Sequence, residues 1–144
     1  MLPSDWQKKL VDMNVTQLKT SDIQWADYVF ISAMNIQKES VKFIIGECVK
    51  QGVKIIAGGP LFTEEYNNYP QIDHLIANEA EITFPLFLKD FNEGHPERIY
   101  KTSEFANITS TPVPDFQLLS QKNYASMNIQ VTRGCFFPFR SLPL

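Results

Sequence analysis

The fold is decided by the stretch YVFISA at residues 28–33, together with VKIIA at residues 53–57. Both are nearly continuous runs of apolar, β-prone residues without the alternation of a half-exposed strand. This pattern is typical of strands that are buried on both faces of a parallel sheet. A third and shorter stretch of this kind is HLIA at residues 74–77. We therefore expect these three segments to form the centre of a parallel sheet.

Helical segments follow the first and the third of these strands. Apolar side chains recur at helical spacing over residues 37–51, and Gly52 stands where glycine commonly ends a helix. A second helix is predicted over residues 82–92, with Pro85 in its first turn, where a missing N–H costs little. This β-α series predicts an α/β fold with a doubly wound, flavodoxin-like (Rossmann-like) parallel sheet in three layers.

The segments on either side of this core are less regular. Residues 7–15 are predicted to form a further strand, and residues 98–101 an edge strand. In the flavodoxin strand order, 2-1-3-4-5, the first strand lies between the second and the third, and no β-α unit precedes residue 7 to supply it. Residues 7–15 would then have to pair with residues 28–33 or stay loosely attached. A genuine four-strand sheet is the alternative.

Composition limits the function. The 144 residues suffice for one core, and a formal net charge of −3 disfavours nucleic acid as the main partner. No apolar run approaches the ~18 residues of a membrane span, and no signal peptide is evident, so a cytoplasmic protein without a membrane partner is expected. The two cysteines do not make a disulfide framework, and Cys48 is expected to be a buried helical residue.

Three loops should meet at the carboxyl ends of the central strands, where α/β proteins of this type bind ligands. They are SAMNIQ at residues 32–37, GGPLFT at residues 58–63 and NEAE at residues 78–81. The paired glycines would let a flat ligand approach the backbone, although a Gly-Gly-Pro sequence is often just a tight turn. The acidic loop has a plain alternative as well, since acidic residues favour a helix N-terminus. His74 is expected to be structural and His95 to lie in a loop.

The sequence VTRGC at residues 131–135 delivers a cysteine at the end of another predicted strand. A strand that ends in Thr-Arg-Gly-Cys resembles the start of the radical SAM domain. That resemblance implies a Cys-x3-Cys-x2-Cys motif, which holds a four-iron, four-sulfur (4Fe-4S) cluster with S-adenosylmethionine on the open iron. Cys135 would be the first cluster ligand, but the next two positions are occupied by Phe139 and Leu142. The cluster site is therefore incomplete, and the chain reads like a frameshifted or prematurely ended gene product.

Taken in order, the three loops and this cysteine resemble the cobalamin-binding domain that precedes the catalytic domain in one class of radical SAM enzymes, which includes the anaerobic magnesium-protoporphyrin ester cyclase. The resemblance implies a cobalamin-binding-like domain over residues 1–105, without the family's first strand and helix, a proline-containing linker over 106–126, and the start of a radical SAM domain over 127–144. It implies cobalamin as the ligand, and no catalytic residue in this chain. The cofactor-binding residues would be Ser32, Ala33, Met34, Asn35, Gln37, Gly58, Gly59, Pro60, Leu61, Asn78, Glu79 and Ala80.

Two departures from the family pattern matter. Asn78 stands where the family usually has glycine, and asparagine tolerates a positive φ better than most residues. The Asp-x-His-x2-Gly motif of cobalamin mutases is absent, because Asp73 and His74 are adjacent. By resemblance, cobalamin would then bind without a protein imidazole on cobalt.

Other functions remain open at this point. A stand-alone flavodoxin-like domain would bind a nucleotide, a flavin or another protein, since fold does not fix function. A phospho-acceptor receiver is disfavoured because Ser32 and Ala33 end the central strand where an acceptor aspartate would sit. A pseudogene product without function is the third possibility. Nothing in the sequence fixes the oligomeric state.

Overall fold

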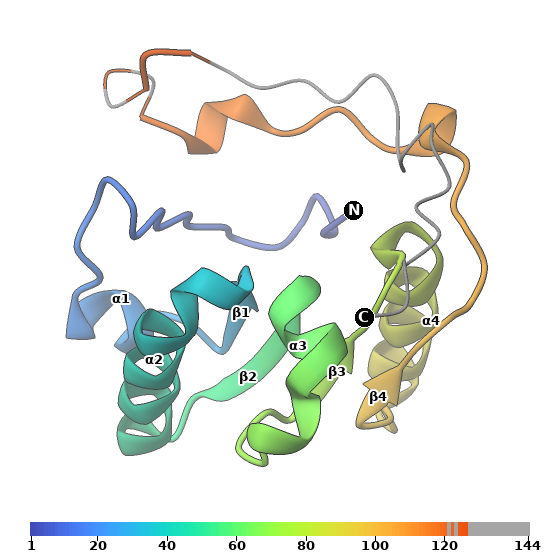
Figure 1. Cartoon of the computed structure of the whole chain (residues 1–144), viewed down its shortest axis with the longest axis horizontal. Coiled ribbons are helices and arrows are strands. Elements are labelled where there is room, and N and C mark those ends of the chain that lie inside the picture. The colour runs from blue at the N-terminus through green and yellow to red at the C-terminus, as the bar shows by residue number, and fades with distance from the viewer. Residues whose placement is uncertain (121, 123, 127–144) are drawn as a thin grey trace, which may run out of the picture.

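A computed structural model describes residues 1–120, 122 and 124–126, so Cys135 and the predicted strand that leads to it lie outside the described residues. Four parallel strands form one sheet in the order β1-β2-β3-β4 (Figure 1). Their bounds are Tyr28–Ser32 for β1, Lys54–Gly58 for β2, His74–Ile76 for β3 and Ile99–Tyr100 for β4. The α/β, flavodoxin-like fold class and the edge strand at residues 98–101 are confirmed.

Four α-helices accompany the strands in the described part of the chain. Their bounds are Thr20–Gln24 for α1, Lys38–Gln51 for α2, Pro60–Glu65 for α3 and Ala80–Glu93 for α4. The two long ones lie where the sequence predicts helices. Gly52 ends α2 with a φ of 69°, in the left-handed conformation that glycine adopts without strain. Short 3-10 turns complete the described chain at Asn35–Gln37, Tyr66–Asn68, Ile108–Ser110 and Phe116–Leu118. None of the helices in the described part of the chain is long and apolar enough to span a membrane.

Alternate residues of the strands point to opposite faces of the sheet and pack into two separate cores. With helices on both faces, the molecule has the three layers that the sequence predicts. On one face, Ile31, Ile55 and Leu75 pack with side chains of α2 and α3. Cys48 belongs to this core and is fully buried, as expected, and burial raises the pKa of its thiol to about 11. On the other face, the core consists of Ile56, Ile76 and Tyr100 of the sheet with Phe84 and Phe87 of α4.

The change of face at α4 has a topological consequence. The strand order advances in one direction from β1 to β4, while α2 and α3 cover one face and α4 covers the other. The crossover from β3 through α4 to β4 therefore has the opposite hand to the two before it. Since right-handed crossovers strongly predominate, the last one is the exception, and it leads to a strand of only two residues, Ile99–Tyr100.

The strand predicted over residues 7–15 is wrong. Asp12 and Asn14 turn the chain there instead: the Asp12 carboxylate accepts hydrogen bonds from the backbone N–H and the side-chain amide of Asn14 at 2.9 and 2.8 Å. The backbone N–H groups of Val15 and Thr16 donate to the Asp12 carbonyl. Short polar side chains that bond to their own backbone compete with a strand ladder in this way. Accordingly, β1 is an edge strand, and the described sheet has four strands.

Trp6 attaches the N-terminal segment to the sheet. Its ring lies 6.3 Å from the ring of Phe30 on β1 and 5.6 Å from that of Phe91 on α4. These contacts add to those that α4 makes with the same face of β1, where the ring of Phe84 lies 6.2 Å from that of Phe30, although Phe30 remains 40% exposed. Aromatic pairs at such distances contribute about 0.5–1.5 kcal/mol beyond the burial of their area. The segment is thus fixed by side-chain packing rather than by strand pairing.

Replacing glycine by alanine is expected to have opposite effects on the free energy of unfolding at two positions. A Cβ at Gly46, inside α2, would meet no atom within 4 Å, so Gly46→Ala should raise the free energy of unfolding by roughly 0.5–1 kcal/mol by reducing the flexibility of the unfolded chain. Gly59 has a φ of 90°, and a Cβ there would lie 3.0 Å from the Ala33 carbonyl oxygen. Gly59→Ala should therefore lower the free energy of unfolding. Urea unfolding followed by circular dichroism measures both. A loss of stability in Gly46→Ala would contradict the open surface seen there.

Candidate ligand-binding edge at the carboxyl ends of the strands

The sheet register brings the three predicted loops to one edge. Ser32 of β1 lies opposite Gly58 of β2, and Gly58 lies opposite Ile76 of β3. The loops that follow these residues therefore begin side by side, as expected for parallel strands. Residues 32–37, 58–61 and 78–80 form what we call the carboxyl edge. The structure thus brings together all the stretches that hold the predicted ligand-binding residues, although it leaves ligand binding there a prediction.

The predicted site residues differ in what they expose at this edge. Two of them, Ala33 and Leu61, are buried and can contribute little beyond their backbone. The Leu61 N–H donates to the Ala33 carbonyl at 3.2 Å, which ties the first loop to the second. The side chains exposed at the edge are those of Ser32, Met34, Asn35, Pro60 and Asn78, while Gln37, Gly58, Gly59, Glu79 and Ala80 are half-buried.

The glycine pair is explained by packing between the loops. A Cβ at Gly58 would lie 3.0 Å from the Ile76 carbonyl oxygen, and one at Gly59 would lie within 3.1 Å of backbone atoms of Ala33 and the Ser32 hydroxyl. Such distances are too short for an ordinary side-chain contact, so neither position tolerates a larger residue without a shift. The glycines are thus required by the close approach of neighbouring strand ends, whether or not a ligand also approaches them.

Asn78 adopts the backbone conformation expected of it. Its φ is 63°, the only positive value at a non-glycine position in the described chain. The Asn78 side-chain amide donates to the Thr102 carbonyl, and its backbone N–H donates to the Thr63 hydroxyl at 3.3 Å. Asparagine thus replaces glycine here and also connects the third loop to α3 and to the chain after β4.

The first loop, residues 32–37, exposes apolar side chains while hydrogen bonds hold its backbone and polar groups in place. The Gln37 side chain accepts a hydrogen bond from the Met34 N–H at 2.9 Å, and the Asn35 amide donates to Glu64 at 2.9 Å. With those polar groups partnered, the side chains of Met34 and Ile36 project, 56% and 94% exposed. Apolar side chains beside polar loop backbone suit a ligand with a broad apolar surface and an amide-bearing rim.

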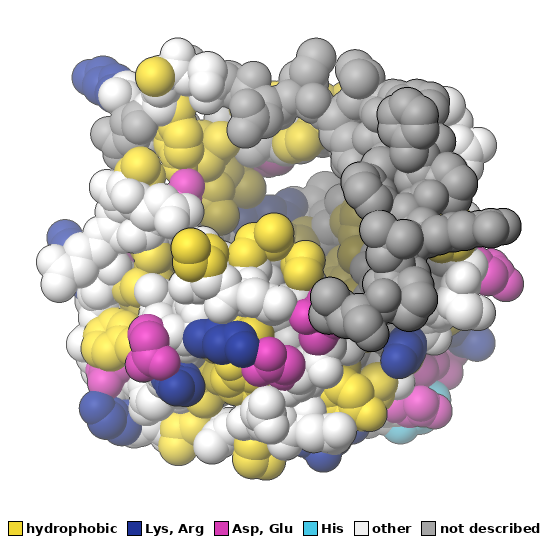
Figure 2. Space-filling model, viewed as in Figure 1, with side chains coloured by type: hydrophobic (Ala, Val, Ile, Leu, Met, Phe, Trp, Pro, Cys, Tyr) yellow, Lys and Arg dark blue, Asp and Glu magenta, His cyan; other side chains and the backbone are white. Residues whose placement is uncertain are grey.

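Two segments cross the molecule beyond this edge: residues 1–19 and residues 101–120 (Figure 1). Shortly after the second segment, the Tyr124 hydroxyl donates to the Asp12 carboxylate at 2.7 Å, a contact across 112 positions of sequence that we call the clasp. The Ala106 N–H donates to Glu79 at 3.3 Å and the Thr111 hydroxyl to Glu81 at 2.9 Å. Figure 2 shows a hollow in this face, below the segment that runs along the top of the same view in Figure 1.

The clasp is the part of this region that sequence reasoning missed. The sequence predicts a strand at Asp12 and a linker at Tyr124. The hydrogen bond from Tyr124, followed by those from Asn14, holds the pKa of the Asp12 carboxyl below its usual range. The same bond raises the pKa of Tyr124. No signal in the sequence pairs two residues so far apart.

Other polar features lie away from the carboxyl edge. His74 is buried under α4, with its Nδ1 2.7 Å from the Glu97 carbonyl, which confirms a structural role. His95 follows the end of α4, in a loop as expected. A groove of about 540 Å³ runs along α2, with Gly46 and Val49 on one side and Tyr69 on the other. The carboxyl edge therefore includes neither of the two histidines and no part of this groove.

The clasp predicts a pH-dependent protection of the N-terminal turn. In Tyr124→Phe, amide hydrogen exchange over residues 8–16 should be faster than in the wild type at neutral pH, because Asp12 loses its hydroxyl donor. Since the pKa of Asp12 is lowered in the folded chain, the stabilisation is complete above the unfolded pKa and is lost as the pH falls through the folded value. The difference between the two proteins should disappear in acid.

Tyr66→Phe serves as the control, because it removes a hydroxyl from the 3-10 turn after α3, away from the clasp. It should leave exchange over residues 8–16 unchanged. Equal exchange in the wild type and Tyr124→Phe at neutral pH would show that the clasp does not hold the N-terminal segment.

Comparison with known proteins gives relatives for almost the whole chain. An uncharacterized methyltransferase of Synechocystis is 37% identical over 140 residues, which are 95% of this chain and 26% of that protein. A hopanoid C-2 methylase of Rhodopseudomonas palustris is 28% identical over 138 residues, which are 93% of this chain and 26% of that protein. This chain therefore spans about a quarter of the length of these curated relatives. No family model matches the sequence.

Among solved structures, the N-terminal domain of a hypothetical protein of Thermotoga maritima superposes with a TM-score of 0.49 at 18% identity, covering 71% of this chain and 98% of that one. So distant a similarity adds nothing on function. The sequence comparisons are more informative, because they relate this chain to part of two longer proteins, one named a methyltransferase and the other a methylase.

Proposed function

We propose that this chain is a cobalamin-binding module of a radical SAM protein that transfers methyl groups. The observation that carries the proposal is the convergence of the three predicted loops on the carboxyl edge, in the order and spacing that resemble the cobalamin-binding family. The names of the two relatives, a methyltransferase and a methylase, are consistent with methyl transfer by a longer protein. The alternative, a flavodoxin-like domain for a nucleotide or flavin, has no observation of its own in its favour.

The residues at the carboxyl edge suit a corrin. Exposed Met34 offers apolar contact to the flat ring, and the loops that begin at Gly58 and Asn78 offer backbone groups to its amide side chains. Asn35, Pro60, Ser32 and the half-buried members of the site would border the ring. Cobalamin, when bound, supplies a cobalt that can carry a methyl group. The chain's own task is to hold and orient it and to limit access of water.

Cobalt would receive no imidazole from the described part of the chain. His74 is buried against Phe87, with its ring centroid 5.4 Å away, and His95 lies beyond the far end of α4. His95 is remote from the carboxyl edge, since α4 begins at Ala80 and its 14 residues span about 21 Å. His74 lies at the opposite end of β3 from the carboxyl edge, with its Nδ1 2.7 Å from the Glu97 carbonyl oxygen. On this proposal the described part of the chain would hold cobalamin through contacts to the corrin ring and its amide side chains rather than through a histidine on cobalt.

Catalysis is assigned to the longer protein rather than to this module. In the proposed division, residues 1–105 form the cobalamin-binding domain, residues 106–126 form a proline-containing linker, and residues 127–144 begin the radical SAM domain. Cys135 would be the first ligand of a 4Fe-4S cluster that binds S-adenosylmethionine, and the other two cysteines of the motif are missing from this sequence. On this proposal the chain as given binds cobalamin and does not transfer methyl groups.

Two exposed apolar residues provide a matched test. Met34 lies on the carboxyl edge and is 56% exposed, while Phe43 lies on the outer surface of α2 and is 54% exposed. After incubation with hydroxocobalamin and desalting, the wild type should retain corrin absorbance at close to one equivalent. Met34→Glu should weaken binding at least about tenfold, since it places a charge against an apolar ring. Phe43→Glu should bind like the wild type.

Three results would contradict the proposal. The first is a folded wild-type chain that retains no corrin, and the second is an equal loss of binding in Met34→Glu and Phe43→Glu. The third is stoichiometric retention of flavin mononucleotide instead, in a parallel experiment, which would favour the flavodoxin-like alternative.

A further inference from the structure

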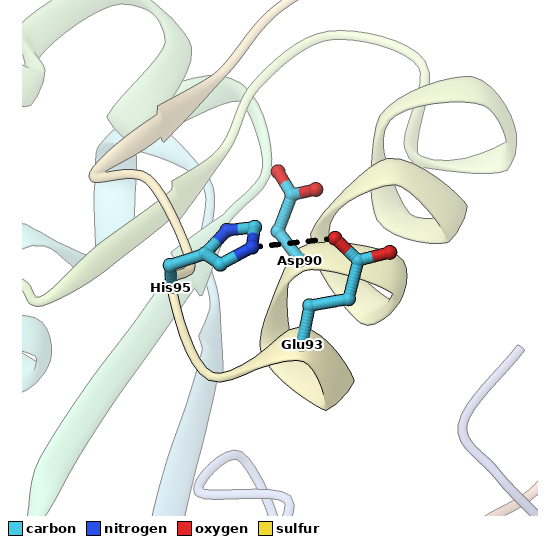
Figure 3. Close-up of side chains that lie close together, drawn as sticks. All are labelled: Asp90, Glu93 and His95. Carbon is cyan, nitrogen blue, oxygen red and sulfur yellow. Dashed lines mark ion pairs between the residues drawn. The ribbon is translucent and has the colours of Figure 1, made fainter.

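A cluster of three potential metal ligands lies at the end of α4, remote from the carboxyl edge. Asp90, Glu93 and His95 each place one ligand atom within 4.8 Å of those of the other two (Figure 3). Asp90 and Glu93 share the last turn of the helix, and His95 follows it after Gly94. The proposed cobalamin function uses none of these three side chains.

The backbone at the helix end brings His95 back to the two carboxylates. Gly94 adopts a left-handed conformation with a φ of 84°, and the His95 N–H then donates to the Asp90 carbonyl at 3.0 Å. This arrangement reverses the chain and fixes His95 beside the last turn. Its Nε2 lies 3.3 Å from a carboxylate oxygen of Glu93. Because Glu93 and His95 are 48% and 69% exposed in their side chains, that ion pair alone contributes little stability.

Asp90 is positioned by a group outside the cluster. The Tyr100 hydroxyl donates to one carboxylate oxygen of Asp90 at 2.8 Å and accepts from the Glu97 N–H at 2.7 Å. The Tyr100 ring is buried and packs edge-on against Phe87 at 5.6 Å. No side chain in the described part of the chain donates to the second Asp90 oxygen. A buried donor that orients a carboxylate and leaves one oxygen available is the usual support for a metal ligand.

The negative charge at the C-terminal end of α4 favours binding of a cation. The C-terminus of a helix carries a partial negative charge, which basic residues normally offset. In this chain, α2 follows that rule with Lys50 in its last turn. By contrast, α4 has no basic residue in its last turn and has Asp90 and Glu93 there. The two carboxylates thus add negative charge at the negative pole of the helix.

The geometry points to a site for one divalent cation of the zinc type, bound by Asp90, Glu93 and His95. One imidazole nitrogen and two carboxylate oxygens are donors that zinc accepts, at about 2.0–2.2 Å each. Ligand atoms around a tetrahedral zinc are roughly 3.4 Å apart. The pair His95–Glu93 is already at 3.3 Å, and an Asp90 oxygen lies within 4.8 Å of both ligand atoms. The exposed side of the cluster leaves the fourth position to water. A bound ion would fasten the end of α4 to the turn that leads into β4.

Zinc titration of the whole chain tests this site, by isothermal titration calorimetry with zinc sulfate after dialysis against a chelator. The wild type should bind one zinc at the cluster, and His95→Gln and Glu93→Gln should each weaken that binding at least about tenfold. Glu39→Gln is the control, because Glu39 is an equally ordinary helical carboxylate, 87% exposed and paired only with Lys42. Cobalt(II) substitution should give a spectrum without a thiolate charge-transfer band, which separates this site from Cys48 and Cys135.

Three outcomes would overturn the inference. The first is a folded wild-type chain that binds no zinc at millimolar concentration. The second is zinc binding that His95→Gln leaves unchanged. The third is a cobalt spectrum with a thiolate band that is the same in His95→Gln and the wild type. Circular dichroism of each variant should match the wild type, since all three substituted side chains are exposed and their removal disturbs no core contact.

Discussion

The close approach of three parallel strand ends is the constraint on which the rest of the structure depends. Ser32, Gly58 and Ile76 lie in register across the sheet, and Gly58 leaves no room for a Cβ beneath the Ile76 carbonyl. Gly59, at a φ of 90°, lets the second loop pass equally close to Ala33. Because these backbones touch, the loops after them form one surface. Residues 1–19 and residues 101–120 both cross this common edge.

The core of this arrangement could be predicted from the sequence because its signals are local. Continuous apolar runs predict β1 and β2, Gly52 predicts the end of α2, and the tolerance of asparagine for a positive φ predicts the turn at Asn78. The strand predicted over residues 7–15 fails for an equally local reason. Hydrogen bonds from Asn14 to the Asp12 carboxylate outweigh the β propensity of the valines and leucine around them.

Features that depend on distant contacts could not be predicted. The clasp joins Asp12 to Tyr124, and the oxygen of Asp90 is held by a hydroxyl ten residues away on another element. Apolar character alone did not distinguish Leu61, fully buried beneath the carboxyl edge, from Met34, which projects from it. Periodicity fixes which face of an element is apolar, whereas the exposure of a loop side chain depends on how the neighbouring loop packs.

The central claim is that the carboxyl edge, rather than any other surface, binds a corrin. Nuclear magnetic resonance of the isotope-labelled chain with paramagnetic cob(II)alamin tests it directly, because the unpaired electron broadens amide signals close to the cobalt. Binding at the carboxyl edge should broaden the amide signals of residues 32–37, 58–61 and 78–80 together. Broadening confined to the groove along α2, or none beyond that of a non-specific additive, would contradict it.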